Sequence, residues 1–99
     1  MGGGYFNSAG AEAATVAGGQ SNTAGGAKSV VGGGSLNTVS AAFGTIGGGG
    51  SSVAGNGNRV TDQWGTVGGG FDNQAGDSAG TAQDCQGATV GGGYGNIAS

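Results

Sequence analysis

The chain has 99 residues, of which 29 are glycine and none is proline, and it carries a formal net charge of -3. This length allows a single domain, and so much glycine without proline excludes a collagen triple helix. Lys28 and Arg59 are the only basic residues, so the chain cannot neutralise a row of phosphates, and nucleic acid is excluded as a partner.

A glycine-rich phrase recurs from one end of the chain to the other. In chain order the copies are MGGGYFNSAG (residues 1–10), TVAGGQSNTAG (15–25), VVGGGSLNTVS (30–40), TIGGGGSSVAG (45–55), TVGGGFDNQAG (66–76) and TVGGGYGNIAS (89–99). Each copy contains one apolar anchor just before its glycines; the anchors are Met1, Val16, Val31, Ile46, Val67 and Val90. Successive anchors are separated by 15, 15, 15, 21 and 23 residues. A period of 15 with two longer intervals predicts a solenoid whose coils accept insertions.

The positions after each anchor form further columns. Glycine fills the next three positions in nearly every copy, and glycine disfavours a helix by about 1 kcal/mol per residue relative to alanine. The sixth position holds Asn7, Asn22, Asn37, Ser52, Asn73 and Asn96, and the eighth holds Ala9, Ala24, Val39, Ala54, Ala75 and Ala98. We therefore expect an all-β parallel solenoid of about six coils, each with two short strands, stacked about 4.8 Å apart. Asparagine would line a turn, where its side chain can bond the neighbouring coils.

The two long intervals predict insertions near residues 56–63 and 77–86. The first reads NGNRVTDQ and is followed by the only tryptophan, Trp64. A loop that projects from a rigid scaffold often carries binding residues, although such a stretch can also pack over the roll. The candidate ligand contacts are Asn58, Arg59, Thr61, Asp62, Trp64, Asp77 and Asp84. Trp64 lies three residues before its anchor, as Phe43 does, and this shared slot favours a structural aromatic ladder.

Three further features leave alternatives open. Tyr5, Phe71 and Tyr94 share the fourth position after the anchor, either as packing against a neighbouring chain or as an exposed stripe for glycans or protein. Threonine precedes most anchors, and a flat threonine ladder would suit ice, but Val30 and the two expected insertions interrupt it. Cys85 has no CxxC partner, so we interpret it as a small buried thiol, or as a residue that meets its copies in an oligomer.

No catalytic, metal or cofactor site is expected. Histidine, the commonest general base and metal ligand, is absent, and the five carboxylates are scattered along the chain. No nucleophile, base and orienting group can be assembled from these residues, which predicts that the protein is not an enzyme. No apolar run approaches the roughly 18 residues of a membrane span, so this segment is not expected to insert into a membrane.

The inward-facing residues are mostly Val, Ile and Ala, which predicts self-association. Ordering the chain costs about 1.5 kcal/mol per residue, against about 25 cal/mol for each Å² of buried apolar surface. A thin roll lined by such small side chains buries too little apolar surface to offset that cost. We therefore expect several rolls to lie side by side, with glycines and valines at their shared surface.

The phrase TVGGGxxNxAG, repeated about every 15 residues over residues 1–99 apart from the two long intervals, resembles the glycine-rich variant of the YadA-like head repeats of trimeric autotransporter adhesins. The resemblance implies a left-handed β-roll, three of which form an extracellular trimer on the bacterial cell surface. It implies that the trimer binds a protein or glycan of the host surface or matrix. It also implies a structural core made by Val16, Val31, Ile46, Val67 and Val90.

The sequence departs from that family in what surrounds the repeats. The family's neck, coiled-coil stalk and membrane anchor have no counterpart in these residues, and neither end has a polar cap, which solenoids normally need. We expect either a fragment of a longer protein or a unit whose ends stack on other copies. The second possibility makes the chain a structural subunit of an extracellular filament, which is the alternative to an adhesin head.

Overall fold

The computed structural model of the chain describes residues 2–53, 56–77 and 86–99. It is all-β, and its strands are two residues long. They are β1 (Thr15–Val16), β2 (Thr23–Ala24), β3 (Val30–Val31), β4 (Thr38–Val39), β5 (Thr45–Ile46), β6 (Arg59–Val60), β7 (Thr66–Val67), β8 (Gln74–Ala75), β9 (Thr89–Val90) and β10 (Ile97–Ala98). Short strands suit a chain in which glycine-rich turns follow each pair of β-forming residues.

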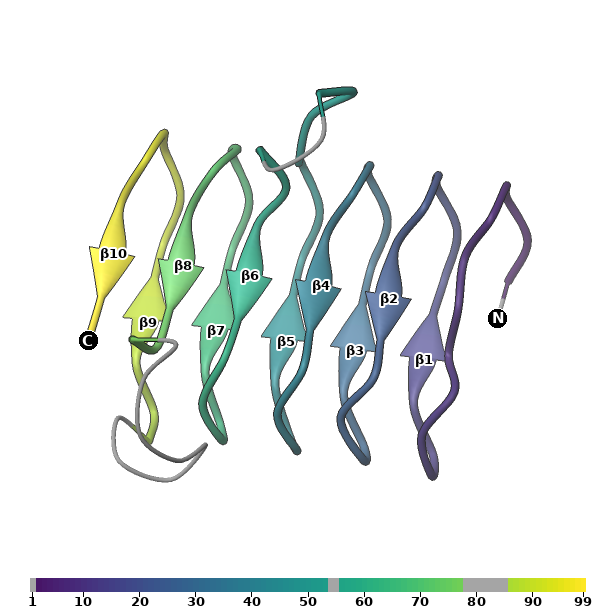
Figure 1. Ribbon diagram of the computed structural model, residues 1–99, viewed down its shortest axis with the longest axis horizontal. Helices are drawn as coiled ribbons and strands as arrows, with labels where there is room; N and C mark the ends of the chain where they lie inside the picture. Colours follow the sequence, from purple (N-terminus) through teal and green to yellow (C-terminus); the bar gives the residue numbers. More distant parts are fainter. Residues whose placement is uncertain (1, 54–55, 78–85) are drawn as a thin grey trace.

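The strands form a parallel β-solenoid. Alternate strands belong to opposite sheets, in the orders β1-β3-β5-β7-β9 and β10-β8-β6-β4-β2, and every pairing is parallel. The strands stack along the longest axis of the molecule, which measures 32 Å, and the turns line the two long edges (Figure 1). The predicted class of fold, a parallel solenoid built from the repeats, is therefore confirmed.

The core lies between the two sheets and consists of small apolar side chains. The first sheet contributes Val16, Val31, Ile46 and Val67, which are fully buried, and Val90, which is 6% exposed. The second sheet contributes Ala24, Val39, Val60 and Ala75, all fully buried. Each strand turns one residue inward and its neighbour outward, because side chains alternate across a β-strand. The anchor Met1 lies outside the described residues.

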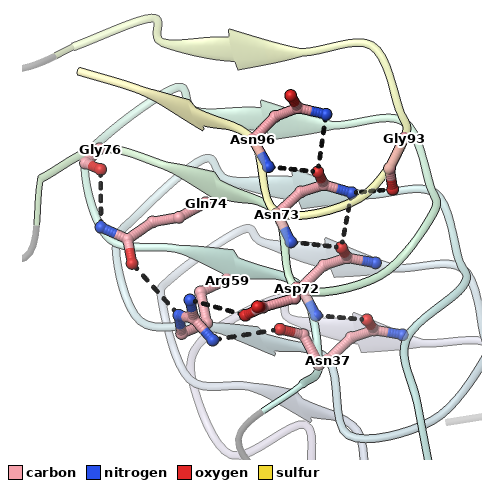
Figure 2. A network of polar contacts seen from close by, with 10 residues as sticks. Asn37, Arg59, Asp72, Asn73, Gln74, Gly76, Gly93 and Asn96 are labelled. Carbon is pink, nitrogen blue, oxygen red and sulfur yellow. Dashed lines mark hydrogen bonds and ion pairs between the residues drawn. The ribbon is translucent and has the colours of Figure 1, made fainter.

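A ladder of asparagines supports one of the two turns in every coil. Its members are Asn7, Asn22, Asn37, Asn58, Asn73 and Asn96. The Asn37 Nδ2 donates to the carbonyls of Gly33 (2.9 Å) and Gly49 (3.0 Å), and its Oδ1 accepts the backbone N–H of Asn58 at 3.0 Å. Figure 2 shows the same connection passing from rung to rung as far as Asn96. The ladder thus links each coil to the next by side chains as well as by strand pairing.

The structure corrects the expected position of the first insertion. Residues 56–63 do not form a projecting loop, because Arg59 and Val60 make β6, which pairs with β4 on one side and β8 on the other. Asn58 and Val60 occupy the columns that Ser52 and Ala54 were expected to fill; Ala54 lies outside the described residues. Gly57 lies against Leu36 of the preceding coil, so the six extra residues are 51–56.

The alignment of this coil with its neighbours, which we call its phase, follows from the hydrogen bonds that a ladder rung must make. Each rung needs one acceptor and two donors on the same side chain, which an asparagine amide provides and a serine hydroxyl does not. Asn58 supplies them: its Nδ2 donates to Gly48 (3.0 Å) and Gly70 (2.9 Å), and its Oδ1 accepts the backbone N–H of Asn73 (3.1 Å). Val60 then fills the core more fully than an alanine would.

Candidate functional site

Arg59 lies on the outer surface of the second sheet, within a network of polar contacts (Figure 2). Its Nη2 pairs with the Asp72 carboxylate at 3.3 Å, and its Nε donates to the Gln74 side-chain oxygen at 3.2 Å. Gln74 in turn donates from Nε2 to the Gly76 carbonyl at 2.8 Å. The guanidinium is therefore held along the roll by contacts within the chain, instead of being offered at the tip of a loop.

Three of the other candidate contacts belong to the framework of the roll. Asn58 is a fully buried ladder rung, and the Thr61 hydroxyl donates to the Ala75 carbonyl at 3.3 Å. Asp62 is 1% exposed, and its carboxylate accepts the backbone N–H of Asp77 at 3.2 Å. These contacts join neighbouring coils, so the three side chains have a structural role. Asp84 lies outside the described residues, as does Cys85.

Trp64 differs from these residues because its side chain is half exposed, at 50%. It lies on the edge formed by the second turn of each coil and stacks on Phe43, with ring centroids 5.3 Å apart and an interplanar angle of 10°. The Lys28 ammonium lies 5.6 Å from the centre of the Phe43 ring, so a cation follows the two rings in the same column. The expected aromatic ladder of Phe43 and Trp64 is confirmed.

The opposite edge carries a second set of rings. Phe71 and Tyr94 are bridge partners in adjacent coils and stack with centroids 4.4 Å apart. Tyr5 pairs with Gln20 in the same column and contacts Phe6 at 4.1 Å. All four rings are well exposed. In the intervening coils Gln20, Ser35 and Gly50 occupy this column, so the aromatic surface is not continuous along the edge.

The outer face of the first sheet carries small, uncharged residues in register. Threonine occupies the outward position of β1, β5, β7 and β9, and Val30 occupies it in β3, all in register. The residues that follow the anchors along this face are glycine or Ala17, and all are exposed. Thr45, Thr66 and Thr89 pair in register across both long intervals, so the expectation that the insertions interrupt the threonine column is wrong. The interruption by Val30 remains.

The second and third glycine positions of the repeat differ in what surrounds them. Gly19, Gly34, Gly49 and Gly70, at the third position, have φ between 79° and 89°, and a Cβ there would overlap the backbone of the next coil. Gly18, Gly33, Gly48 and Gly69, at the second position, show no left-handed backbone, and a Cβ would meet nothing within 4 Å. The fold of a single chain therefore requires glycine at the third position and leaves the second free.

The part of the chain that the structure describes contains no pocket and no group of three or more metal-ligating side chains. Among the same residues, no helix is long and apolar enough to cross a membrane. Candidate sites are therefore confined to surfaces: the two aromatic edges, the glycine–threonine face and the Arg59 network.

No family model, curated protein or solved structure matches the chain. The site must be judged on its own geometry. Two roles were not predicted from the sequence: Asn58 is a ladder rung, and Gln74 is an almost buried partner of Arg59. A signal for the first was present, since asparagine, and not serine, fills this column in the five other copies.

Proposed function

We propose that the chain is the head of a trimeric adhesin on the bacterial cell surface. Three left-handed β-rolls of about six coils each lie side by side, and their exposed edges bind a host surface or matrix protein or glycan. The assembly is extracellular and uses no cofactor. The resemblance of the repeated phrase to the glycine-rich YadA-like heads supports this proposal, and so does the parallel solenoid that the repeats form.

The observation that carries the proposal is the column of second-position glycines. Gly18, Gly33, Gly48 and Gly69 are glycine in successive coils although nothing in their own chain would meet a Cβ. A partner whose backbone approaches closely would exclude side chains from this column. The adjoining face is uncharged, and an identical face on a second chain offers the same register of about 4.8 Å. The glycine column and the adjoining face of one chain can therefore pack, coil against coil, on the same surface of another chain.

The mass of the assembled 99-residue chain in solution, measured by light scattering, tests this assembly. We expect three chains per particle at all concentrations above the dissociation constant. An open-ended series of masses would instead support the alternative, a structural filament built by stacking of solenoid units. A stable monomer would contradict both.

A pair of lysine substitutions locates the shared surface. Gly48→Lys is expected to leave the circular dichroism spectrum unchanged, because the new side chain meets open space in the single chain, but to shift the mass from trimer to monomer. Ala13→Lys adds the same charge on an edge, where the fold already places Lys28 with the same backbone conformation, and should remain trimeric. If Gly48→Lys stayed trimeric, the second-position column would not be the interface.

A further inference from the structure

On the edge that carries Trp64, one residue from each coil forms a regular column, and the residue after Trp64 in this column is a glycine, Gly87. At this turn the backbone N–H of each column residue donates to a carbonyl of the preceding coil. The pairs are Phe43 to Ala27 at 2.9 Å, Trp64 to Ala42 at 3.3 Å and Gly87 to Gln63 at 3.0 Å. Gly87 therefore takes the place in its coil that Trp64 and Phe43 take in theirs.

This arrangement leaves one face of the indole without a ring from the next coil. Phe43 covers the opposite face in a nearly parallel stack, and Lys28 follows beyond Phe43. Among the described residues, no atom lies within 4 Å of a Cβ built at Gly87, the position beside Trp64 where the next side chain of the column would begin. One end of the stack is thus closed by a cation, and the other end presents an aromatic face.

Two amide side chains border this face. Gln63 immediately precedes Trp64, Gln86 immediately precedes Gly87, and the Gln86 Nε2 donates to the Gln63 Oε1 at 3.4 Å. That bond leaves the Gln63 amide nitrogen as a donor and the Gln86 amide oxygen as an acceptor for a ligand. Small-molecule sites usually combine apolar and aromatic groups with a few polar groups that fix orientation. Here the same combination lies on an open surface, because the described residues form no pocket.

We propose that Trp64, with Gln63 and Gln86, binds a pyranose ring of a β-linked glucose-type oligosaccharide. The equatorial hydroxyls of such a ring leave its two faces lined by C–H groups, which are attracted to the negative face of an indole. Its hydroxyls both donate and accept, as the two amides require. This inference rests on the proposed function, which it deepens by naming the class of ligand and its place on the head.

The single tryptophan makes the test direct, because the fluorescence of the chain comes mainly from Trp64. Titration of the intact protein with cellotetraose is expected to give a saturable change in emission. Sorbitol at equal hydroxyl concentration is expected to give none, because it has no pyranose face. A response that is absent, or equal for both compounds, would overturn the inference.

Two variants and a control separate binding from folding. Gly87→Phe is expected to extend the stack over the indole and weaken cellotetraose binding about tenfold or more, with Trp64 still in place. The left-handed backbone of Gly87 suits this change, since Phe43 adopts it in the same column (φ 61°). Trp64→Ala, followed by calorimetry, should weaken binding at least as much, whereas Tyr94→Ala on the other edge should not. Binding by Gly87→Phe equal to that of the unchanged protein would overturn the inference.

Light scattering on the same samples keeps this inference distinct from the proposed assembly. A trimer that does not respond to cellotetraose contradicts the sugar site and leaves the assembly intact. A monomer that binds contradicts the trimer and supports the site. If Trp64→Ala or Gly87→Phe dissociates the particle, the stack is an interface between chains, and the sugar site is overturned.

Discussion

Asparagine is the residue on which the turns of this solenoid depend. One amide donates to two glycine carbonyls, one in its own coil and one in the next, and accepts a backbone N–H from the next rung. Aspartate lacks the donors, and glutamine carries the same amide one methylene further from the backbone. Asn22, Asn37, Asn58 and Asn73 are completely buried, so each of these bonds forms away from water, where an unmet polar group is costly.

We predict that Asn37→Ala lowers the free energy of unfolding by roughly 2 kcal/mol, because it leaves the Gly33 carbonyl and the Asn58 N–H without their partner, at about 1 kcal/mol each. The Gly49 carbonyl loses the amide but keeps the backbone N–H of Ser35 at 2.9 Å. Asn96→Ala is the matched control: its rung is exposed, and water can replace the amide. Its cost should be about 1 kcal/mol or less. Urea unfolding followed by circular dichroism measures both. Equal losses for the two variants would show that the buried ladder contributes no more than an exposed cap.

At the scale of strands and turns, most of the architecture could be predicted from the sequence, but the phase of one coil could not. The anchors Ile46 and Val67 fix the first sheet, because an apolar residue between threonine and glycine recurs there without ambiguity. In the coil after Ile46, residues 52–55 imitate the Asn-x-Ala-Gly pattern with serine in place of asparagine. Only the requirement for three hydrogen bonds at each rung distinguishes Ser52 from Asn58.

The same ambiguity limited the candidate site. The sequence pattern puts the rung of this coil at Ser52, six residues before Asn58, and so predicts a loop for the residues that follow. Their side chains instead contact neighbouring coils; these residues are Asn58, Arg59, Thr61 and Asp62. The stacking of Phe43 and Trp64 was predictable, since a shared slot places side chains one coil apart. The two groups of glycines look identical in the sequence. Only φ and the space around each Cβ separate them.

We predict that deletion of residues 51–56 leaves the solenoid folded. Gly50 and Gly57 then become adjacent, and β5 joins β6 through the same number of residues that joins β3 to β4. Replacement of residues 56–63 by a glycine–serine link of equal length should abolish folding, because it removes β6, the Asn58 rung and the Val60 core contact. Circular dichroism and thermal unfolding compare the two. Survival of the second variant would contradict the observed phase of this coil.

The whole molecule is a narrow stack in which each coil contacts only its neighbours. Among the described residues, the buried apolar side chains are valine, alanine and one isoleucine, whereas every aromatic ring is exposed. In most domains large side chains supply much of the hydrophobic stabilisation, at about 1.5–3 kcal/mol for each one buried. Here the small core and the uncharged outer face of the first sheet together favour a fold that is completed by association.

Because association stabilises only the folded chain, the melting temperature of the proposed trimer should depend on protein concentration. For three chains in one particle, we predict a rise of several degrees, roughly, for each tenfold increase in concentration, as mass action shifts the equilibrium toward folded chains. Gly48→Lys, which removes the shared surface but adds no clash within the chain, should melt lower and at a temperature independent of concentration. Ala13→Lys should behave as the unchanged protein does. A concentration-independent transition in the unchanged protein would mean that one narrow roll is stable alone, and that the second-position glycines have another cause.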